Sequence, residues 1–110
     1  MCEAFGLSNY KLLREPAQNG INYLEYHRNP YSVWRYQPRD NDNDTSVTGW
    51  VIMALNAALK AKLDAAGFRG ARRFLDSVTW PAYYQVGYLH QRDGGTNRLN
   101  AVGMLSRLFI

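Results

Sequence analysis

The stretch that decides the fold is Trp34–Leu59, which reads WRYQPRDNDNDTSVTGWVIMALNAAL. It starts with aromatic residues, continues through a cluster of Asp and Asn, and ends in a long apolar run. Asp44 and Thr45 are residue types that cap helices, so we expect a helix from about Ser46 to Ala65. Because this helix is apolar on nearly every side, other elements must surround it. The sequence therefore predicts an all-α fold with this helix at its centre.

Further helices are expected on both sides of this stretch, where apolar residues recur at a spacing of three and four. Pro16 suits a first helical position, and Asn29-Pro30 ends the helix that is expected from Pro16 to about His27. The segment Phe68–Val78 has the one-sided pattern of an outer helix. The remaining expectations lie at the chain ends: a last helix from Thr96 or Asn97 to Ile110, and a closing helical turn at Met1–Phe5 with Gly6 as its stop. Because both end helices look cut, we expect a fragment.

Composition and charge limit the class of protein. A chain of 110 residues has the length of one domain, and 46% hydrophobic residues argue against disorder. The net charge of +4 comes from dispersed basic residues, and only Arg69, Arg72 and Arg73 form a compact group, so we expect no nucleic-acid partner. No apolar run is long enough to span a membrane. The single cysteine, Cys2, fits a reducing compartment, so we expect a cytoplasmic protein.

The two halves of the chain resemble each other weakly at an offset of roughly 50 residues. Trp34-Arg-Tyr36, followed by an Asp-rich loop, parallels Val86-Gly-Tyr88 and its Arg-Asp-Gly-Gly loop. The helix start Thr48–Met53 likewise parallels Ala101–Leu105. Such a period, with one inner and one outer helix in each unit, is typical of arrays of helical hairpins.

A longer match carries a family resemblance. It consists of NGINYLEYHRNPYSVWRYQPRDNDNDTSVTGWVIMALNAALKAKL and, downstream, AVGMLSRLF. These segments resemble the squalene cyclase/prenyltransferase repeat proteins of the α/α-toroid, terpenoid cyclase-like fold. They are more closely similar to an uncharacterised bacterial subgroup with a W-x-Y, a polar loop, D-T-S-V-T-G-W and an A-L-rich helix.

The resemblance implies a barrel of about six hairpins in which inner helices alternate with outer ones. This chain would hold a single partial α/α-toroid domain over residues 1–110, with two hairpin repeats at 8–65 and 68–110. The family carries a glutamine and glycines before its repeat tryptophan, whereas this chain has His27 or Arg28 and then Ser32-Val33. The glutamine's capping role is therefore not carried over.

The resemblance also suggests cyclase activity as a possible function. Class II triterpene cyclases protonate an alkene with the middle aspartate of a D-x-D-D-T-A motif. Aligned on Asp44-Thr45-Ser46, this chain has Asn41 at the first aspartate and Asn43 at the proton donor. An amide cannot supply that proton, so we expect a non-catalytic repeat module. The alternative is a terpene or squalene cyclase-type domain acting on an apolar isoprenoid, which a buried Asp42 or Asp44 facing a cavity would favour.

Other chemistry finds little support in the residues. Asp40-x-Asp42-x-Asp44 has calcium-loop spacing, but Thr45 and Val51 stand where that loop needs a glycine and a glutamate. A solvated loop whose last residue caps the following helix is the favoured interpretation. His27 and His90 are far apart in sequence, and Cys2 has no activating neighbour, so we expect neither a metal nor a cofactor. Asp93-Gly94-Gly95 is typical of a turn.

The aromatic residues provide the candidate binding site. Trp34, Tyr36 and Trp50 lie in the loop or at the helix start, with Asp44 between them. One interpretation is that the rings pack the loops onto the hairpins. The other is a groove for a hydrophobic or peptide-like ligand. Because two hairpins cannot cover the apolar helix Val47–Leu59, we also predict self-association or contact with the remainder of a larger toroid.

Overall fold

A computed structural model describes residues 1–93 and 96–110. The described residues are mostly helical, as predicted, and add one two-stranded antiparallel sheet that the sequence pattern did not predict. The elements in chain order are α1 (Cys2–Ser8), η1 (Lys11–Leu13), α2 (Arg14–His27), α3 (Thr45–Lys60), α4 (Ala71–Val78), β1 (Thr79–Trp80), η2 (Pro81–Tyr83), β2 (Gln85–Val86) and α5 (Asn97–Phe109). Gly94 and Gly95, at which a turn is expected, lie outside the described residues.

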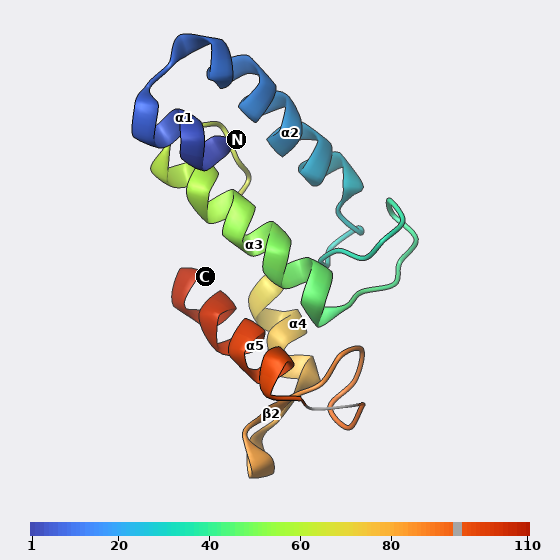
Figure 1. The fold of residues 1–110 in the computed structure, drawn as a ribbon. Coiled ribbons are helices and arrows are strands. Elements are labelled where there is room, and N and C mark those ends of the chain that lie inside the picture. Colours follow the sequence, from blue (N-terminus) through green and yellow to red (C-terminus); the bar gives the residue numbers. More distant parts are fainter. Residues whose placement is uncertain (94–95) are drawn as a thin grey trace.

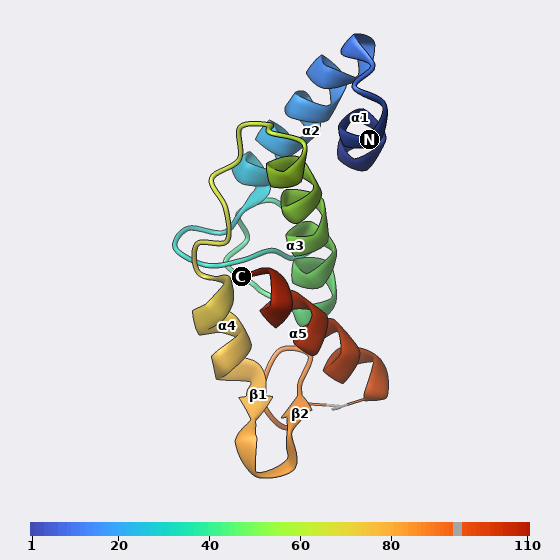
Figure 2. The ribbon, with the colours of Figure 1, turned by 90° about the vertical axis from the view of Figure 1, so that its left-hand side faces the viewer.

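The helices form two antiparallel hairpins in an elongated molecule of 47 × 27 × 18 Å (Figure 1). α2 and α3 are antiparallel in the first hairpin, and α4 and α5 are antiparallel in the second (Figures 1 and 2). α3 and α5 lie side by side and point the same way. α3 contacts each of the other four α-helices, which confirms its predicted central position.

The core lies where α2, α3 and α4 meet the segment before α3. Among the described residues, its largest fully buried apolar side chains come from all four of these elements. They are Trp34, Ile21, Ile52, Leu55, Leu75, Val33 and Val78. Two of them, Val33 and Trp34, belong to a segment without regular secondary structure, so the loop contributes to the core as a helix would.

The central helix begins as predicted but ends earlier than Ala65. Asp44 is its N-cap, and the carboxylate accepts a hydrogen bond from Val47 N–H at 2.7 Å. The helix stops at Lys60 because Lys62 has a φ of 56° and Leu63 N–H returns to the carbonyl of Ala58 at 3.0 Å. This stop is built without glycine, so the usual sequence signal is missing.

Two other helix boundaries differ from the expected ones. Gly6 lies inside α1 rather than after it. Its lack of a side chain allows the close approach of Ala61 to α1. Asn9, with a φ of 52°, ends the helix instead. α4 begins at Ala71 rather than Phe68, since Gly70 has a φ of 81° and its backbone lies against Ser32. The start of α5 is as predicted, with Thr96 accepting a bond from Leu99 N–H.

The structure contains a repeat of 52 residues, the spacing that separates Tyr36 from Tyr88. The caps of α3 and α5, Asp44 and Thr96, have the same separation. In each unit a helix side chain accepts the backbone N–H of the preceding segment. These bonds run from Trp34 to Thr48 and from Val86 to Asn100, again 52 residues apart. The observed register equates Thr48 with Asn100, one residue from the predicted pairing with Ala101.

Candidate functional site

An exposed apolar surface of the molecule lies around Trp50. Its ring is 72% exposed, although it belongs to the central helix. It borders a hollow of about 560 Å³ between α1, α2 and α3. The apolar side chains that line this hollow include Ile21, Leu24, Met53, Ala54 and Ala57. The exposed face of α3 is therefore a recessed apolar surface rather than a flat one.

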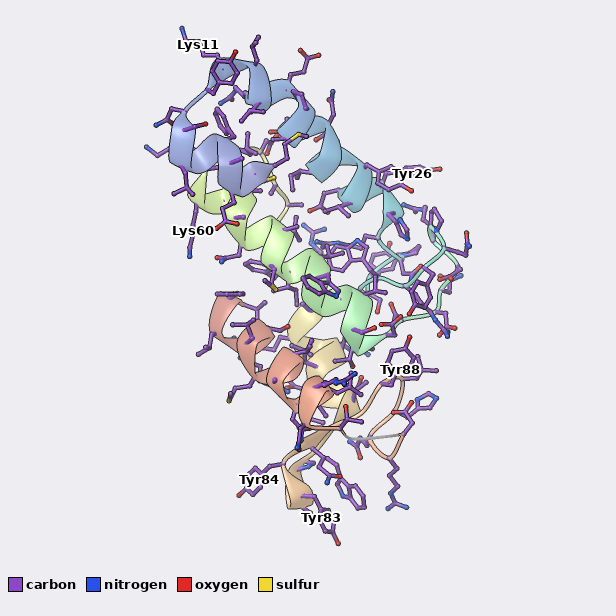
Figure 3. The ribbon with its side chains drawn as sticks, viewed as in Figure 1. Lys11, Tyr26, Lys60, Tyr83, Tyr84 and Tyr88 are labelled. Atoms are coloured by element: carbon purple, nitrogen blue, oxygen red, sulfur yellow. The ribbon has the colours of Figure 1, made fainter. Side chains whose placement is uncertain are left out.

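A second hollow of about 340 Å³ adjoins the first on the same helix. Met53 and Ala57 line both, and Phe109 at the end of α5 closes the second. The ammonium of Lys60 lies 5.9 Å from the ring centroid of Phe109 and gives this end of the surface a polar rim. Lys60 projects away from the helices at the C-terminal end of α3 (Figure 3). The two hollows together follow α3 from Trp50 to Ala61.

Trp34, a predicted ligand contact, is part of the core. It is only 1% exposed, and its indole N–H donates to the carbonyl of Leu24 at 2.8 Å. The guanidinium of Arg28 lies 4.3 Å from the ring centroid. A ligand cannot reach this ring in the observed arrangement. The residue packs the loop onto the first hairpin, which is the other interpretation that the sequence left open.

Tyr36 is exposed but lies at the opposite end of α3 from the hollows. Its hydroxyl is 3.2 Å from that of Tyr88, so it joins the loops of the two repeats. The hydrogen bond with Tyr36, and then burial, raises the pKa of Tyr88 to about 12. Tyr88 also accepts the N–H of Thr45 on its carbonyl at 3.0 Å (Tyr88 is labelled in Figure 3). Tyr36 and Trp50 therefore do not share one site.

Asp44 is fully buried at the start of α3. Its Oδ1 accepts hydrogen bonds from Val47 N–H and from Ser46 Oγ, both at 2.7 Å. Its Oδ2 lies 3.9 Å from Nε of Arg35 and has no hydrogen-bond partner among the described residues. The carboxylate lines neither of the hollows on α3. It acts as the predicted helix cap, enclosed between the loop and the helix.

Asn41 and Asn43, the two asparagines of the Asp/Asn cluster before α3, help to hold the loop together. Asn43 accepts hydrogen bonds from the side chain of Asn29 at 3.1 Å and from Val33 N–H at 3.2 Å. Asn41 N–H donates to Asn29 Oδ1 at 3.0 Å. Asn29 itself is buried, and its amide also donates to the carbonyl of Asp42. Sequence reasoning treated Asn29 only as the end of a helix, because a long-range role of an amide leaves no local pattern.

Asp93 organises the second loop in the same way. Its carboxylate accepts hydrogen bonds from the N–H groups of Tyr88, Leu89 and His90 at 2.6 to 2.9 Å. Burial alone would raise the pKa of Asp93, but these three bonds outweigh it and lower the pKa below its ordinary value. Gly87 is required because a side chain there would overlap the carbonyl of His90.

The other candidate ligands of metals are dispersed. Asp42 forms an ion pair with Arg35, and Asp40 accepts the N–H of Asp42 at 3.0 Å. His27 lies 2.9 Å from the carbonyl of Arg35, while His90 is exposed. Within residues 1–93 and 96–110, no three His, Cys, Asp or Glu side chains are grouped so that they could hold a metal ion. In the same residues, no helix combines the length and the apolar character needed to cross a membrane.

No protein-family model, no curated protein and no solved structure matches this chain. The resemblance to the terpenoid cyclase-like repeats therefore stays a prediction.

Proposed function

We propose that this chain is a non-catalytic interaction module that binds an apolar partner on the exposed face of α3. The observation that carries this proposal is the hollow of about 560 Å³ beside the largely exposed ring of Trp50. Concave apolar surfaces of this kind are the common form of binding sites for apolar groups. Tryptophan is also enriched among the residues that contribute most to binding.

Burial of the Trp50 side chain would supply part of the free energy of binding. Covering roughly 150 Å² of an aromatic side chain at about 25 cal/mol per Å² contributes about 4 kcal/mol. Neighbouring apolar side chains such as Met53 and Leu24 add to this term. A free energy of about 4 kcal/mol corresponds to a dissociation constant of about 1 mM, and part of it offsets the freedom lost on association, so tighter binding requires that the partner also cover these neighbouring side chains.

The proposed architecture is that of α/α-toroid hairpins. In this arrangement α3 and α5 are inner helices, and α2 and α4 are outer helices. The 52-residue repeat and the parallel, adjacent course of α3 and α5 support the assignment (Figure 1). The exposed face of α3 would then face the interior of a ring, where an apolar ligand or a neighbouring hairpin is accommodated.

The alternative is a terpenoid cyclase-type enzyme that acts on an apolar isoprenoid. The burial of Asp44 favours it, since the catalytic acid of such an enzyme must be enclosed. However, Oδ1 of Asp44 already caps α3, and Asn43 stands where the proton donor of the motif belongs. The carboxylate is also separate from the apolar hollows. Binding without catalysis is therefore the better-supported function.

A fluorescent apolar probe tests the proposal. Anilinonaphthalene sulfonate should bind the wild-type chain with a saturable increase in emission, and Trp50→Ala should weaken this binding at least tenfold. Tyr26→Ala is the matched control because Tyr26 is an exposed aromatic residue on α2 that lies away from the hollow (Figure 3). Equal binding by wild type and Trp50→Ala, with unchanged circular dichroism, would show that the α3 face is not the site.

A further inference from the structure

One side of α5 is more exposed to solvent than the side of α3 that corresponds to it in the 52-residue repeat. This side carries a hollow of about 430 Å³, and the α5 residues that line it are Asn97, Asn100, Ala101, Gly103, Met104 and Arg107. Their counterparts in the 52-residue repeat are Thr45, Thr48, Gly49, Val51, Ile52 and Leu55, all of which are buried. We call this surface of α5 the receiving side. It is covered in the first repeat unit and partly open in the second, where Asn97, Ala101 and Met104 are exposed while Gly103 is buried beneath Val86.

The cover over α3 shows what kind of element fits such a surface. Val102 of α5 lies so close over Gly49 that any side chain there would overlap its methyl group, and Ser106 lies beside it. The hydroxyl of Thr45 donates to the carbonyl of Gly87 at 2.7 Å. The covering element is therefore the helix of a second unit, together with the loop that precedes it.

The first unit of the chain presents the same covering element, against which the short helix α1 packs. Trp50 and Ala54 occupy the places in the repeat that Val102 and Ser106 occupy in α5, and Tyr36 occupies the place of Tyr88. α1 contributes Met1, Cys2 and Glu3 to the edge of this region but leaves the ring of Trp50 largely exposed. One chain thus carries an open receiving side and an open covering face.

We propose that the receiving side of α5 docks the α3 face of a second copy of this chain, with Trp50 of that copy over Ala101. This names the partner for the proposed function and rests on it. The contact extends the α3–α5 interface inside the chain. Ala101 is small enough to accept a large ring, and Met104 beside it is unbranched and adapts its shape to what it contacts. The two faces differ, so the association is head-to-tail.

Two single variants test this arrangement. Trp50→Glu damages only the covering face, and Met104→Glu damages only the receiving side; both side chains are largely exposed, at 72% and 68%, so both variants should fold. In sedimentation velocity over the micromolar range, the wild type should associate with increasing concentration, and each variant alone should remain a monomer. An equimolar mixture should form a one-to-one dimer, because each variant retains the face that the other has lost. Leu12→Glu, at an exposed position remote from both faces, should associate as the wild type does.

A monomeric wild type, or a mixture that stays monomeric, would overturn the head-to-tail contact. If the wild-type chain is monomeric but binds the apolar probe through Trp50, the proposed function stands and only the choice of partner fails. If the probe does not bind at Trp50 but the mixture dimerises, the contact between copies stands without a general apolar site. Unchanged melting temperatures of the variants exclude misfolding as the cause of either result.

Discussion

At the residue scale, the side chains that join the two repeats are polar and lie at the start of α3. Tyr36 and Tyr88 pair through their hydroxyls, Thr45 binds the second loop, and Asp44 caps the helix. The two tryptophans of the predicted binding site differ in exposure, because Trp34 is buried and Trp50 is largely exposed. Loop organisation and the proposed partner binding therefore belong to different residues.

The pairing of Tyr36 with Tyr88 predicts an unusual titration. In the folded chain the pKa of Tyr88 is about 12, above its ordinary value of 10.0. Because the neutral phenol is favoured on folding, its contribution to the free energy of unfolding is fully present below about pH 10 and is lost as the pH rises through about 12. Ultraviolet titration of tyrosinate should show one late step. Tyr36→Phe should move that step to lower pH, and Tyr88→Phe should remove it.

The cap of α3 predicts a difference between two substitutions of Asp44. Asp44→Ala removes the acceptor of the Val47 N–H bond and should lower the free energy of unfolding by about 1–2 kcal/mol. Asp44→Asn keeps an oxygen that can cap the helix and should lower it by less. Urea unfolding followed by circular dichroism measures both. Equal losses in the two variants would mean that the charge beside Arg35, rather than the cap, is what stabilises the site.

At the element scale, the contact between α3 and α5 depends on the absence of a side chain at Gly49. Val102 occupies the space that a Cβ would need, and the helices meet closely at this point. Glycine usually weakens a helix, so its presence in the middle of α3 reflects this packing rather than helix propensity.

Two glycine substitutions separate packing from propensity. Gly49→Ala should lower the free energy of unfolding by about 1–3 kcal/mol, because the new methyl group forces α5 away. Gly20→Ala in α2 meets no atom within 4 Å and should instead raise it by about 0.5–1 kcal/mol. Thermal and urea unfolding of both variants provide the measurement. A stabilised Gly49→Ala chain would show that α3 and α5 are not closely packed in solution.

The sequence predicts the elements well where the signal is local. The cap at Asp44, the starts of α3 and α5, and the central place of α3 follow from capping residues and apolar periodicity. The end of α3 and the β1–β2 pair were missed, because Lys62 in a left-handed conformation and strands of two residues leave no pattern. Of the candidate site residues, Trp50 could be predicted from its place on an apolar helix. The burial of Trp34 could not, because it depends on contacts with Leu24 and Arg28, which lie outside the Trp34–Leu59 stretch.

At the scale of the whole molecule, the two hairpins are held together by more than the α3–α5 contact. The linker between them, residues 61–70, is held by the side chains of Gln18 in α2 and of Arg28 directly after α2. Gln18 donates to the carbonyl of Asp64 at 2.7 Å and accepts its N–H at 2.9 Å. Arg28 donates to the carbonyls of Gly67 and Arg69 at 2.6 and 3.2 Å, and burial lowers its pKa from the ordinary value.

The fixed linker has a consequence for how proteases would cut the chain. A protease normally cuts first in an irregular connection between two units, because such a segment is exposed and unfolds locally with little cost. Here cleavage requires that the four hydrogen bonds with Gln18 and Arg28 be broken beforehand. One accessible tip is instead the turn between β1 and β2, where Tyr83 and Tyr84 project into solvent (Figure 3). A cut there falls inside the second hairpin, so digestion opens that hairpin before it separates the two units.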